Sequence, residues 1–127
     1  MSDINRPDVV AELTALYDQY EKALCSNDIA TMTHLFWDSP HVVRFGATEN
    51  LYGSEELAAF RQHRPAIHLE REILKLQVVS FGETSASITL EFRRVVNGQP
   101  RLGRQSQMWQ KLAEGWKIVS AHVSFLP

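Results

Sequence analysis

Residues 84–112 have the sequence TSASITLEFRRVVNGQPRLGRQSQMWQKL, in which two long strand-like runs flank Asn97 and Gly98. An Asn-Gly pair in this position is a strong signal for a tight β-hairpin, because both residues tolerate positive φ angles. Two further runs of strand composition lie on either side, at residues 71–82 and 116–126. The second half of the chain is therefore predicted to form a meander of antiparallel strands.

The first half of the chain carries helical patterns. Asp28 is suited to cap a helix, and Pro65 is suited to end one. Apolar side chains recur at the spacing of one helix face before residue 27, and the set comprises Val9, Leu13, Leu16, Tyr17, Tyr20 and Leu24. In chain order, the sequence predicts a helix over 7–26, a helix over 29–37, a short strand over 41–45 and a helix over 54–64.

Helices followed by a long meander describe an α+β domain. We expect a curved antiparallel sheet that wraps one face of the N-terminal helices, with room for a pocket between the two layers. The chain has 127 residues, which is enough for one sizeable core and too few for two. Since the sequence shows no repeat and no linker, residues 1–127 are predicted to form a single domain.

The composition narrows the class of function. A formal net charge of -2 gives no general electrostatic case for binding nucleic acid or an anionic membrane. No apolar run reaches transmembrane length, and the single cysteine, Cys25, excludes an intrachain disulfide, which fits a cytoplasmic protein. The sequence lacks a Gly-rich phosphate loop, an HExxH motif and clustered Cys and His residues. Any catalysis is therefore expected to need no metal and no cofactor.

Arg44 stands in the apolar run from Val42 to Phe45, where strand alternation leaves both faces partly apolar. A strand with two apolar faces is buried, and a buried guanidinium is costly unless it is paired. Arg44 therefore either pairs with an internal acid, such as Glu49 or Glu91, or projects into a cavity where a ligand carboxylate completes it. The sequence leaves these two interpretations open.

Tyr17 and Tyr20 lie about one turn apart on the first predicted helix, so one or both face inward. A buried tyrosine is ordinarily a core aromatic residue whose hydroxyl finds a backbone partner. At the edge of a cavity it can instead donate a hydrogen bond or a proton, especially beside a cation that lowers the cost of the phenolate. Both tyrosines are therefore candidates for a site.

Polar side chains on the last strands are further candidates for a small-molecule site. Strict alternation along residues 116–125 puts His122 on one face with two hydroxyls and two large apolar groups. There the imidazole either is structural or orients a substrate. Alternation also brings polar side chains to both faces of the neighbouring strands, among them Glu91 and Arg104. His122, Glu91 and Arg104 are thus predicted to line the pocket.

Several local strings carry a resemblance to a known family. They are NRPDVVAEL at the start, LFW with VVRFGATENLYG, then AFRQHR, GRQSQMW and GWKIVSAHVS, and they span nearly the whole chain. With these strings the chain resembles the nuclear transport factor 2-like (SnoaL-like) cone fold. More narrowly, it resembles the AtzH-like and HpxZ-like proteins of dicarboxyurea and oxalurate catabolism. The cone fold alone implies little about activity, because it hosts isomerases, cyclases, dehydratases and non-catalytic domains.

The AtzH-like resemblance implies decarboxylation of 1,3-dicarboxyurea to urea-1-carboxylate in s-triazine nitrogen catabolism, without metal or organic cofactor. It implies roles for a tyrosine of the first helix and for the arginine after the paired valines, which correspond here to Tyr20 and Arg44. The HpxZ-like resemblance implies an oxalurate-related ureido acid of purine degradation instead. The residues that remain candidates for binding the substrate are Tyr17, Glu91, Arg104 and His122.

Three functions from different classes follow from these observations. The first is a cofactor-free decarboxylase acting on a small anionic ureido-carboxylate. The second is an accessory or metabolite-binding protein that works with an amidase of oxalurate catabolism. The third is an isomerase or cyclase for a larger apolar ligand, which would need an inward carboxylate base such as Glu91 and is disfavoured by the arginine and the glutamines. A homodimer is expected in each case, because open curved sheets of this class commonly pair face to face.

Overall fold

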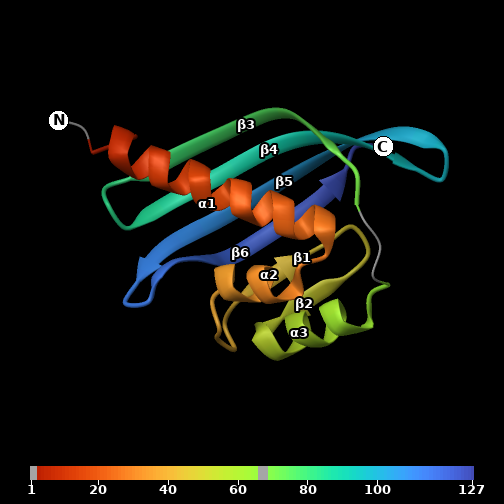
Figure 1. Ribbon diagram of the computed structural model, residues 1–127, viewed down its shortest axis with the longest axis horizontal. Coiled ribbons are helices and arrows are strands. Elements are labelled where there is room, and N and C mark those ends of the chain that lie inside the picture. Colours follow the sequence, from red (N-terminus) through yellow and green to blue (C-terminus); the bar gives the residue numbers. More distant parts are fainter. Residues whose placement is uncertain (1–2, 66–68) are drawn as a thin grey trace.

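The computed structural model describes residues 3–65 and 69–127, and its helices and long strands follow the predicted order (Figure 1). The helices are α1 (Pro7–Ser26), α2 (Ile29–Leu35) and α3 (Gly53–His63). The strands are β1 (Val43–Phe45), β2 (Asn50–Tyr52), β3 (Glu72–Phe81), β4 (Ser85–Val96), β5 (Gln99–Leu112) and β6 (Gly115–Phe125). The short strand β2 falls in a segment whose composition predicts only a turn-prone link.

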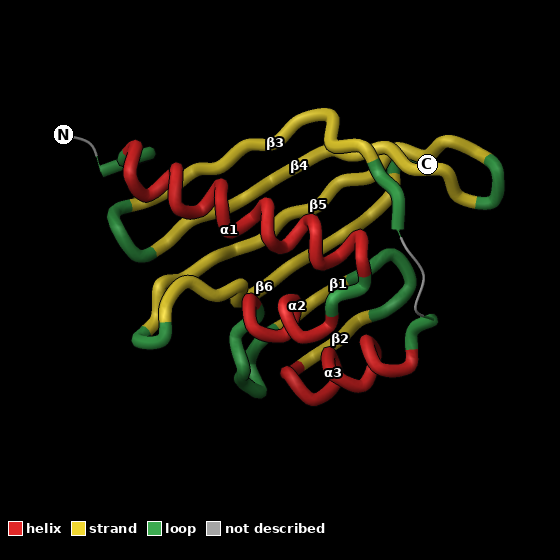
Figure 2. The backbone as a smooth tube through the Cα atoms, viewed as in Figure 1, coloured by secondary structure: helices red, strands yellow, loops and turns green. Residues whose placement is uncertain are grey.

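The strands form one sheet in the order β2-β1-β6-β5-β4-β3. The strands from β3 to β6 pair as the predicted antiparallel meander, whereas β1 lies parallel to β6 and carries β2 on its other side. The helices lie on one side of the sheet, with α1 across its face and α2 beside α3 near the β1–β2 edge (Figure 2). The predicted α+β class and curved-sheet architecture are therefore confirmed.

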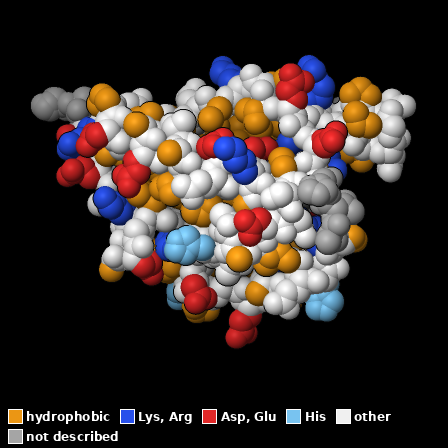
Figure 3. Space-filling model, in the orientation of Figure 1, with side chains coloured by type: hydrophobic (Ala, Val, Ile, Leu, Met, Phe, Trp, Pro, Cys, Tyr) orange, Lys and Arg blue, Asp and Glu red, His pale blue; other side chains and the backbone are white. Residues whose placement is uncertain are grey.

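The core fills the space between the helices and the sheet. Side chains alternate along β4, where four apolar residues are buried and the residues between them face away, and the buried set is Ala86, Ile88, Leu90 and Phe92. This alternation defines an inner face of the sheet, toward the helices, and an outer face. On the helix side of the molecule, acidic and basic side chains are interspersed (Figure 3). No helix in the described part of the chain is both long and apolar enough to span a membrane.

Two local sequence signals act as predicted. The Asp28 carboxylate accepts hydrogen bonds from the Thr31 backbone N–H at 3.1 Å and from the Thr31 hydroxyl at 2.7 Å, which caps α2. Asn97 and Gly98 adopt φ angles of 53° and 78° and join β4 to β5 in a tight hairpin. The cap turns the chain from α1 into α2, and the hairpin fixes the register of β4 and β5.

The expectation of strict alternation along β6 is wrong because of a β-bulge. Two successive residues of β5 pair with Ser120 and Ile118 of β6, so Val119 between them is an extra residue. Ile118 is fully buried on the inner face. After the bulge the alternation is displaced by one position, and Ser120 and His122 therefore lie on the outer face.

Candidate functional site

A small cavity lies between the helices and the β1–β2 edge of the sheet, and we call it the inner cavity. Its volume of about 10 Å³ is enough for about one water molecule. Its walls are mostly apolar side chains of α1, α2, β2 and α3. The polar residues that line it are Tyr20 of α1, Arg44 of β1, Arg61 of α3 and Arg64 just after α3.

Arg44 reaches the inner cavity because of the position of β1 in the sheet. It pairs with Ala121 of β6 and Leu51 of β2, which are both buried, so its side chain points to the inner face. Its Nη1 donates a hydrogen bond of 2.7 Å to Oε2 of Glu49, and both side chains are largely buried. Each sequence interpretation therefore holds in part, because Arg44 has an internal acid as its partner and also lines a cavity.

Glu49 is held in place by its own loop. The Thr48 hydroxyl donates a hydrogen bond of 2.7 Å to Glu49 Oε1. Gly46 leaves room for the carboxylate, since a Cβ at that position would collide with Glu49. Burial by itself would raise the pKa of Glu49, but the hydrogen bonds from Thr48 and Arg44 outweigh burial and hold the pKa below its usual value. Glu49 is therefore charged at neutral pH, and its carboxylate faces the guanidinium of Arg44.

Tyr20 faces the inner cavity from α1. Its ring contacts those of Tyr17 and Phe36, with centroid distances of 5.8 and 6.0 Å. The residue is 2 % exposed, and within residues 3–65 and 69–127 its hydroxyl has no hydrogen-bond partner. Tyr20, unlike Tyr17, therefore keeps a hydroxyl that can meet a ligand in this cavity.

Arg61 is a buried cation that our sequence interpretation did not single out. It is 5 % exposed, and its guanidinium carbon lies 4.6 Å from the centroid of the Phe36 ring. Its Nη2 atom has no hydrogen-bond partner in the described part of the chain. Burial lowers the pKa of Arg61 to about 10, with smaller contributions from the charges of Arg44 and Arg64. Arg61 therefore stays charged at neutral pH without a carboxylate beside it.

The helical spacing of α3 could have revealed Arg61. It follows the buried Leu57 by four residues, so the two lie on one helix face, and Arg64 caps the C-terminal end of α3. The Arg64 Nη2 donates a hydrogen bond of 3.3 Å to Oδ1 of Asn27, which is a neutral partner. Around the inner cavity, the described residues thus supply one carboxylate, that of Glu49, and three guanidiniums, those of Arg44, Arg61 and Arg64.

Comparison with known proteins assigns the chain to a family. A family model described as AtzH-like matches residues 2–127. The chain belongs to the AtzH-like family. A solved structure from Pectobacterium atrosepticum, a protein of unknown function from the DUF3225 family, shares 45% identity with this AtzH-like chain. The match covers 98% of this chain and 96% of that one, with a TM-score of 0.92.

Other solved structures support the same fold. A cystatin-like fold protein from Burkholderia xenovorans is 41% identical over 98% of each chain, with a TM-score of 0.89. An NTF2-like protein of unknown function from Pseudomonas putida is 17% identical over 94% of this chain and 87% of that one, with a TM-score of 0.81. No curated protein matches the chain. The AtzH-like resemblance and the NTF2-like fold predicted from the sequence are both confirmed.

Tyr17 of this AtzH-like chain belongs to a separate group that we call the Arg71 cluster, made of Arg71, Glu21, Tyr17, Gln105 and Cys25. Arg71 donates hydrogen bonds from Nε and Nη2 to the two carboxylate oxygens of Glu21, at 2.8 and 2.7 Å. The Tyr17 hydroxyl donates to Glu21 Oε1 at 2.7 Å and accepts from Arg71 and Gln105. The Cys25 thiol lies 3.6 Å from Glu21 Oε2. Tyr17 is therefore committed to a closed network and does not line the inner cavity.

The charges of the Arg71 cluster suit a structural role. Burial alone would raise the pKa of Glu21, but hydrogen bonds and the positive charge of Arg71 keep the pKa below its usual value. Burial and the Glu21 charge raise the pKa of Tyr17 far above that of a free phenol. Tyr17 is therefore a poor proton donor, although the sequence alone left both tyrosines open.

His122, Glu91 and Arg104 lie on the outer face of the sheet, contrary to the expectation that they share a pocket with Arg44. All three residues are exposed. His122 contacts Phe45 edge to face, with ring centroids 5.8 Å apart, and Arg104 donates a hydrogen bond of 3.1 Å to the Ser124 hydroxyl. These contacts stabilise the outer face and do not reach the inner cavity.

Strand register explains these positions. The bulge at Val119 turns His122 outward. On β4 and β5, the pairing of Glu91 with Arg104 puts both side chains on one face, and the neighbouring Gln105 is buried on the opposite one. An isomerase or cyclase that used Glu91 as an inward base therefore has no support from the structure.

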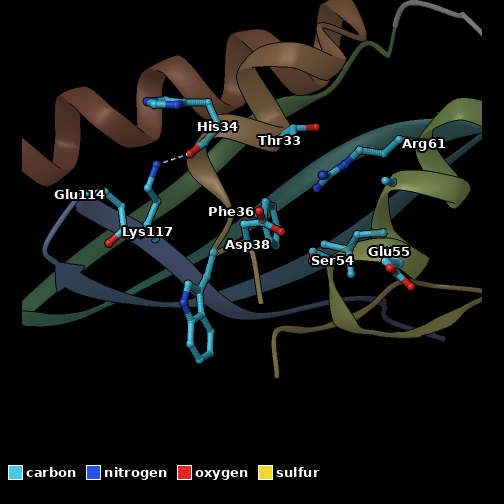
Figure 4. A pocket seen from close by; sticks show the side chains of 12 residues that line it. Thr33, His34, Phe36, Asp38, Ser54, Glu55, Arg61, Glu114 and Lys117 are labelled. Atoms are coloured by element: carbon cyan, nitrogen blue, oxygen red, sulfur yellow. Dashed lines mark hydrogen bonds between the residues drawn. The ribbon is translucent and has the colours of Figure 1, made fainter. Parts of the chain in front are cut away.

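A larger hollow lies beside the inner cavity and has a volume of about 450 Å³ (Figure 4). We call it the outer pocket, although it lies among the helices and not on the outer face of the sheet. It is lined by side chains of α2, of the loop after α2, of α3 and of the start of β6. Arg61 and Leu57 line both the outer pocket and the inner cavity. These two side chains therefore form the wall between the two spaces.

Proposed function

We propose that this AtzH-like chain is a cofactor-free decarboxylase for a small N-carboxylated urea, either 1,3-dicarboxyurea or an oxalurate-related ureido acid, in nitrogen catabolism. The observation that carries the proposal is that Tyr20 and Arg44 line one cavity. They come from different elements, α1 and β1, and they are the residues to which the family resemblance assigns the reaction. The proposal is also supported by the family model that matches residues 2–127.

The chemistry requires a carboxylate clamp and an acid. An N-carboxylated urea is a carbamate, and when its C–N bond breaks, carbon dioxide leaves and the electron pair stays on nitrogen. A proton must then reach that nitrogen, and a positioned acid typically contributes roughly 100-fold to 10,000-fold to the rate. Since His122 lies on the outer face, Tyr20 is the donor that faces the inner cavity. Arg61 and Arg64 line the same cavity as Tyr20.

Arg44 can hold a ligand carboxylate without losing Glu49. A guanidinium has five N–H donors, and Glu49 accepts from one nitrogen of Arg44, Nη1. The remaining donors suit a two-point hydrogen bond to a carboxylate. The apolar walls of the inner cavity would strip water from that carboxylate, which favours the neutral carbon dioxide. Glu49 in this arrangement orients the guanidinium.

The experiment that tests the proposal is the rate of carbon dioxide release from freshly generated 1,3-dicarboxyurea. We expect the native protein to exceed the spontaneous rate, and Tyr20→Phe to lose roughly 100-fold to 10,000-fold of the acceleration. Arg44→Gln should lose the clamp and most of the acceleration. Tyr52→Phe is the matched control, because Tyr52 is an exposed tyrosine outside the inner cavity.

Three results would decide against the decarboxylase. One is a native rate equal to the spontaneous rate with both ureido acids. Another is full activity of Tyr20→Phe, and the third is equal loss of activity in Tyr20→Phe and Tyr52→Phe. Thermal unfolding of every variant checks that a loss of rate is not a loss of fold.

The second candidate function is a non-catalytic accessory or metabolite-binding protein that works with an amidase. The Arg44–Glu49 ion pair favours this role, because the guanidinium already has a carboxylate when no ligand is bound. A stable complex with a co-expressed amidase, together with no carbon dioxide release by the protein alone, would support it. The homodimer and the cytoplasmic location stay predictions, and sedimentation of the purified chain tests the former.

A further inference from the structure

Arg61 is buried in a way that the protein alone does not compensate. It is 5 % exposed, and no carboxylate of the described residues pairs with it. A buried charge without a partner is strongly destabilising, so natural proteins keep such groups where another molecule supplies the partner. Stacking on Phe36 is the one described contact of its guanidinium. The side chain can therefore turn toward a ligand without breaking a hydrogen bond.

The sizes of the two spaces indicate where a ligand arrives. The inner cavity, at about 10 Å³, holds about one water molecule and is too small for a ureido acid. The outer pocket, at about 450 Å³, lies within the range of small-molecule sites. Because Arg61 and Leu57 form the wall between them, a movement of Arg61 would join the two spaces into one site.

In the outer pocket the positively charged residues are buried and the negatively charged ones are exposed. Its buried charged residues are the cations Arg61 and Lys117, whereas Asp38, Glu55 and Glu114 are exposed and solvated. The Lys117 Nζ donates one hydrogen bond of 2.6 Å to a backbone carbonyl of α2, drawn as a dashed line in Figure 4, which leaves further N–H donors. An anion that enters the pocket therefore meets positive charge at its floor.

We propose that the outer pocket is the entrance to the inner cavity, and that Arg61 binds the carboxylate of the incoming ligand. The identity of the ligand as a ureido-carboxylate rests on the function proposed above, whereas the role of Arg61 rests on its burial and on its place between the two spaces. With Arg44 and Glu49 already paired, Arg61 supplies the first unpaired guanidinium that a carboxylate meets. Arg61 thereby selects for a second negative charge on the ligand.

Calorimetric titration with glutarate and glutaramate tests this role. Glutarate carries two carboxylates on a carbon chain that does not decarboxylate, and in glutaramate one of the two is a neutral amide. We expect the native protein to bind glutarate more tightly. Arg61→Gln should weaken glutarate binding by roughly 10-fold to 100-fold and reduce the preference over glutaramate. Arg93→Gln, at an exposed arginine of β4 that pairs with Glu72, should bind as the native protein does.

Two further variants test the entrance. Ala58→Phe and Thr33→Phe each add a large side chain to the outer pocket, and neither residue lines the inner cavity. Both variants are expected to slow the association of both probes by a similar factor, as measured by stopped-flow mixing. Thermal unfolding selects the variants that keep the native fold. Arg61→Lys is a second test of Arg61, because it keeps the positive charge and removes the guanidinium.

Several results would overturn the proposal. They are native affinity for glutarate in folded Arg61→Gln, the absence of glutarate binding to the native protein at millimolar concentration, and native association rates in folded Ala58→Phe and Thr33→Phe. The outcome is separable from that of the decarboxylase. Loss of glutarate binding in Arg61→Gln, in a protein that releases no carbon dioxide, would keep the role of Arg61 and reject the catalysis. Carbon dioxide release by the native protein, together with unaltered glutarate binding in Arg61→Gln, would keep the catalysis and reject the role of Arg61.

Discussion

Arg71 and Arg61 are both buried guanidiniums that lie over a phenylalanine ring, and they differ in what surrounds their N–H groups. Arg71 lies 4.4 Å from the centroid of Phe92 and donates hydrogen bonds to three side chains, one of them a carboxylate. Arg61 lies 4.6 Å from the centroid of Phe36, and its Nη2 has no partner within the described ranges. Both guanidiniums thus lie over an aromatic ring. The N–H groups of Arg71 have hydrogen-bond partners, whereas Nη2 of Arg61 has none among the described residues.

The difference teaches that burial alone does not tell a structural arginine from a binding one. The partners of Arg71 come from α1 and β5, so its contacts form as the helix packs on the sheet. Nη2 of Arg61 has no such partner among the described residues, and in our proposal a ligand carboxylate supplies it. Groups kept in an unfavourable environment cluster at functional sites, where removing them can raise stability and abolish function together.

The largest expected effect is the loss of stability in Arg71→Met. Removing one member of a buried ion pair typically costs about 3–5 kcal/mol, because the other charge stays buried without its partner. Urea denaturation measures this loss as a lower free energy of unfolding. Arg93→Met is the control, since the exposed pair of Arg93 with Glu72 is expected to contribute within about 1 kcal/mol. Equal losses of stability in Arg71→Met and Arg93→Met would show that the Arg71 cluster does not stabilise the fold.

Arg61→Met is expected to have the opposite sign. It removes a buried donor without a partner, whose burial costs about 1–3 kcal/mol, and it keeps an apolar chain against Phe36. The free energy of unfolding should stay unchanged or rise by up to about 3 kcal/mol, while glutarate binding weakens as in Arg61→Gln. Urea denaturation in the absence of ligand is the measurement. A loss of stability as large as that of Arg71→Met would show that Arg61 is a structural residue, as Arg71 is.

The smallest effect is a pH dependence that belongs to Glu21. Its pKa in the folded protein is lowered, so its stabilisation is complete above the usual carboxyl value of about 4.3 and is lost as pH falls through the lowered pKa. The deficit of Glu21→Gln relative to the native protein should therefore be largest near neutral pH and shrink toward about pH 3. Urea midpoints across this range measure it. A deficit that stays constant with pH would mean that Glu21 carries no charge in the cluster.

The sequence sufficed for those parts of the fold that depend on local chemistry. The Asn97-Gly98 hairpin and the Asp28 cap each follow from a few neighbouring residues. The low exposure of the Arg44 side chain follows from the apolar run in which it stands. Tyr20 was selected by family resemblance, and the structure places it beside the same cavity as Arg44.

The sequence failed where position depends on distant pairing. The bulge at Val119 arises from how β5 and β6 pair, and it moved His122 from the expected pocket to the outer face. Arg71 precedes β3, and its partners Glu21 and Gln105 are far from it in the chain. Arg61 did carry a local signal in its spacing from Leu57, but a charged residue on a helix is ordinarily assigned to the solvent face.

Cys25 gives the Arg71 cluster a chemical reporter. It is the single cysteine of the chain, and burial, followed by the charge of Glu21, raises the pKa of its thiol. Alkylating reagents react with thiolates, so the raised pKa slows the reaction of this half-buried cysteine as long as the cluster stays closed. The rate at which a maleimide or iodoacetamide labels Cys25 would therefore follow the transient opening of the Arg71 cluster. The molecule thus contains its own probe of local opening, one residue along α1 from Leu24 of the inner cavity.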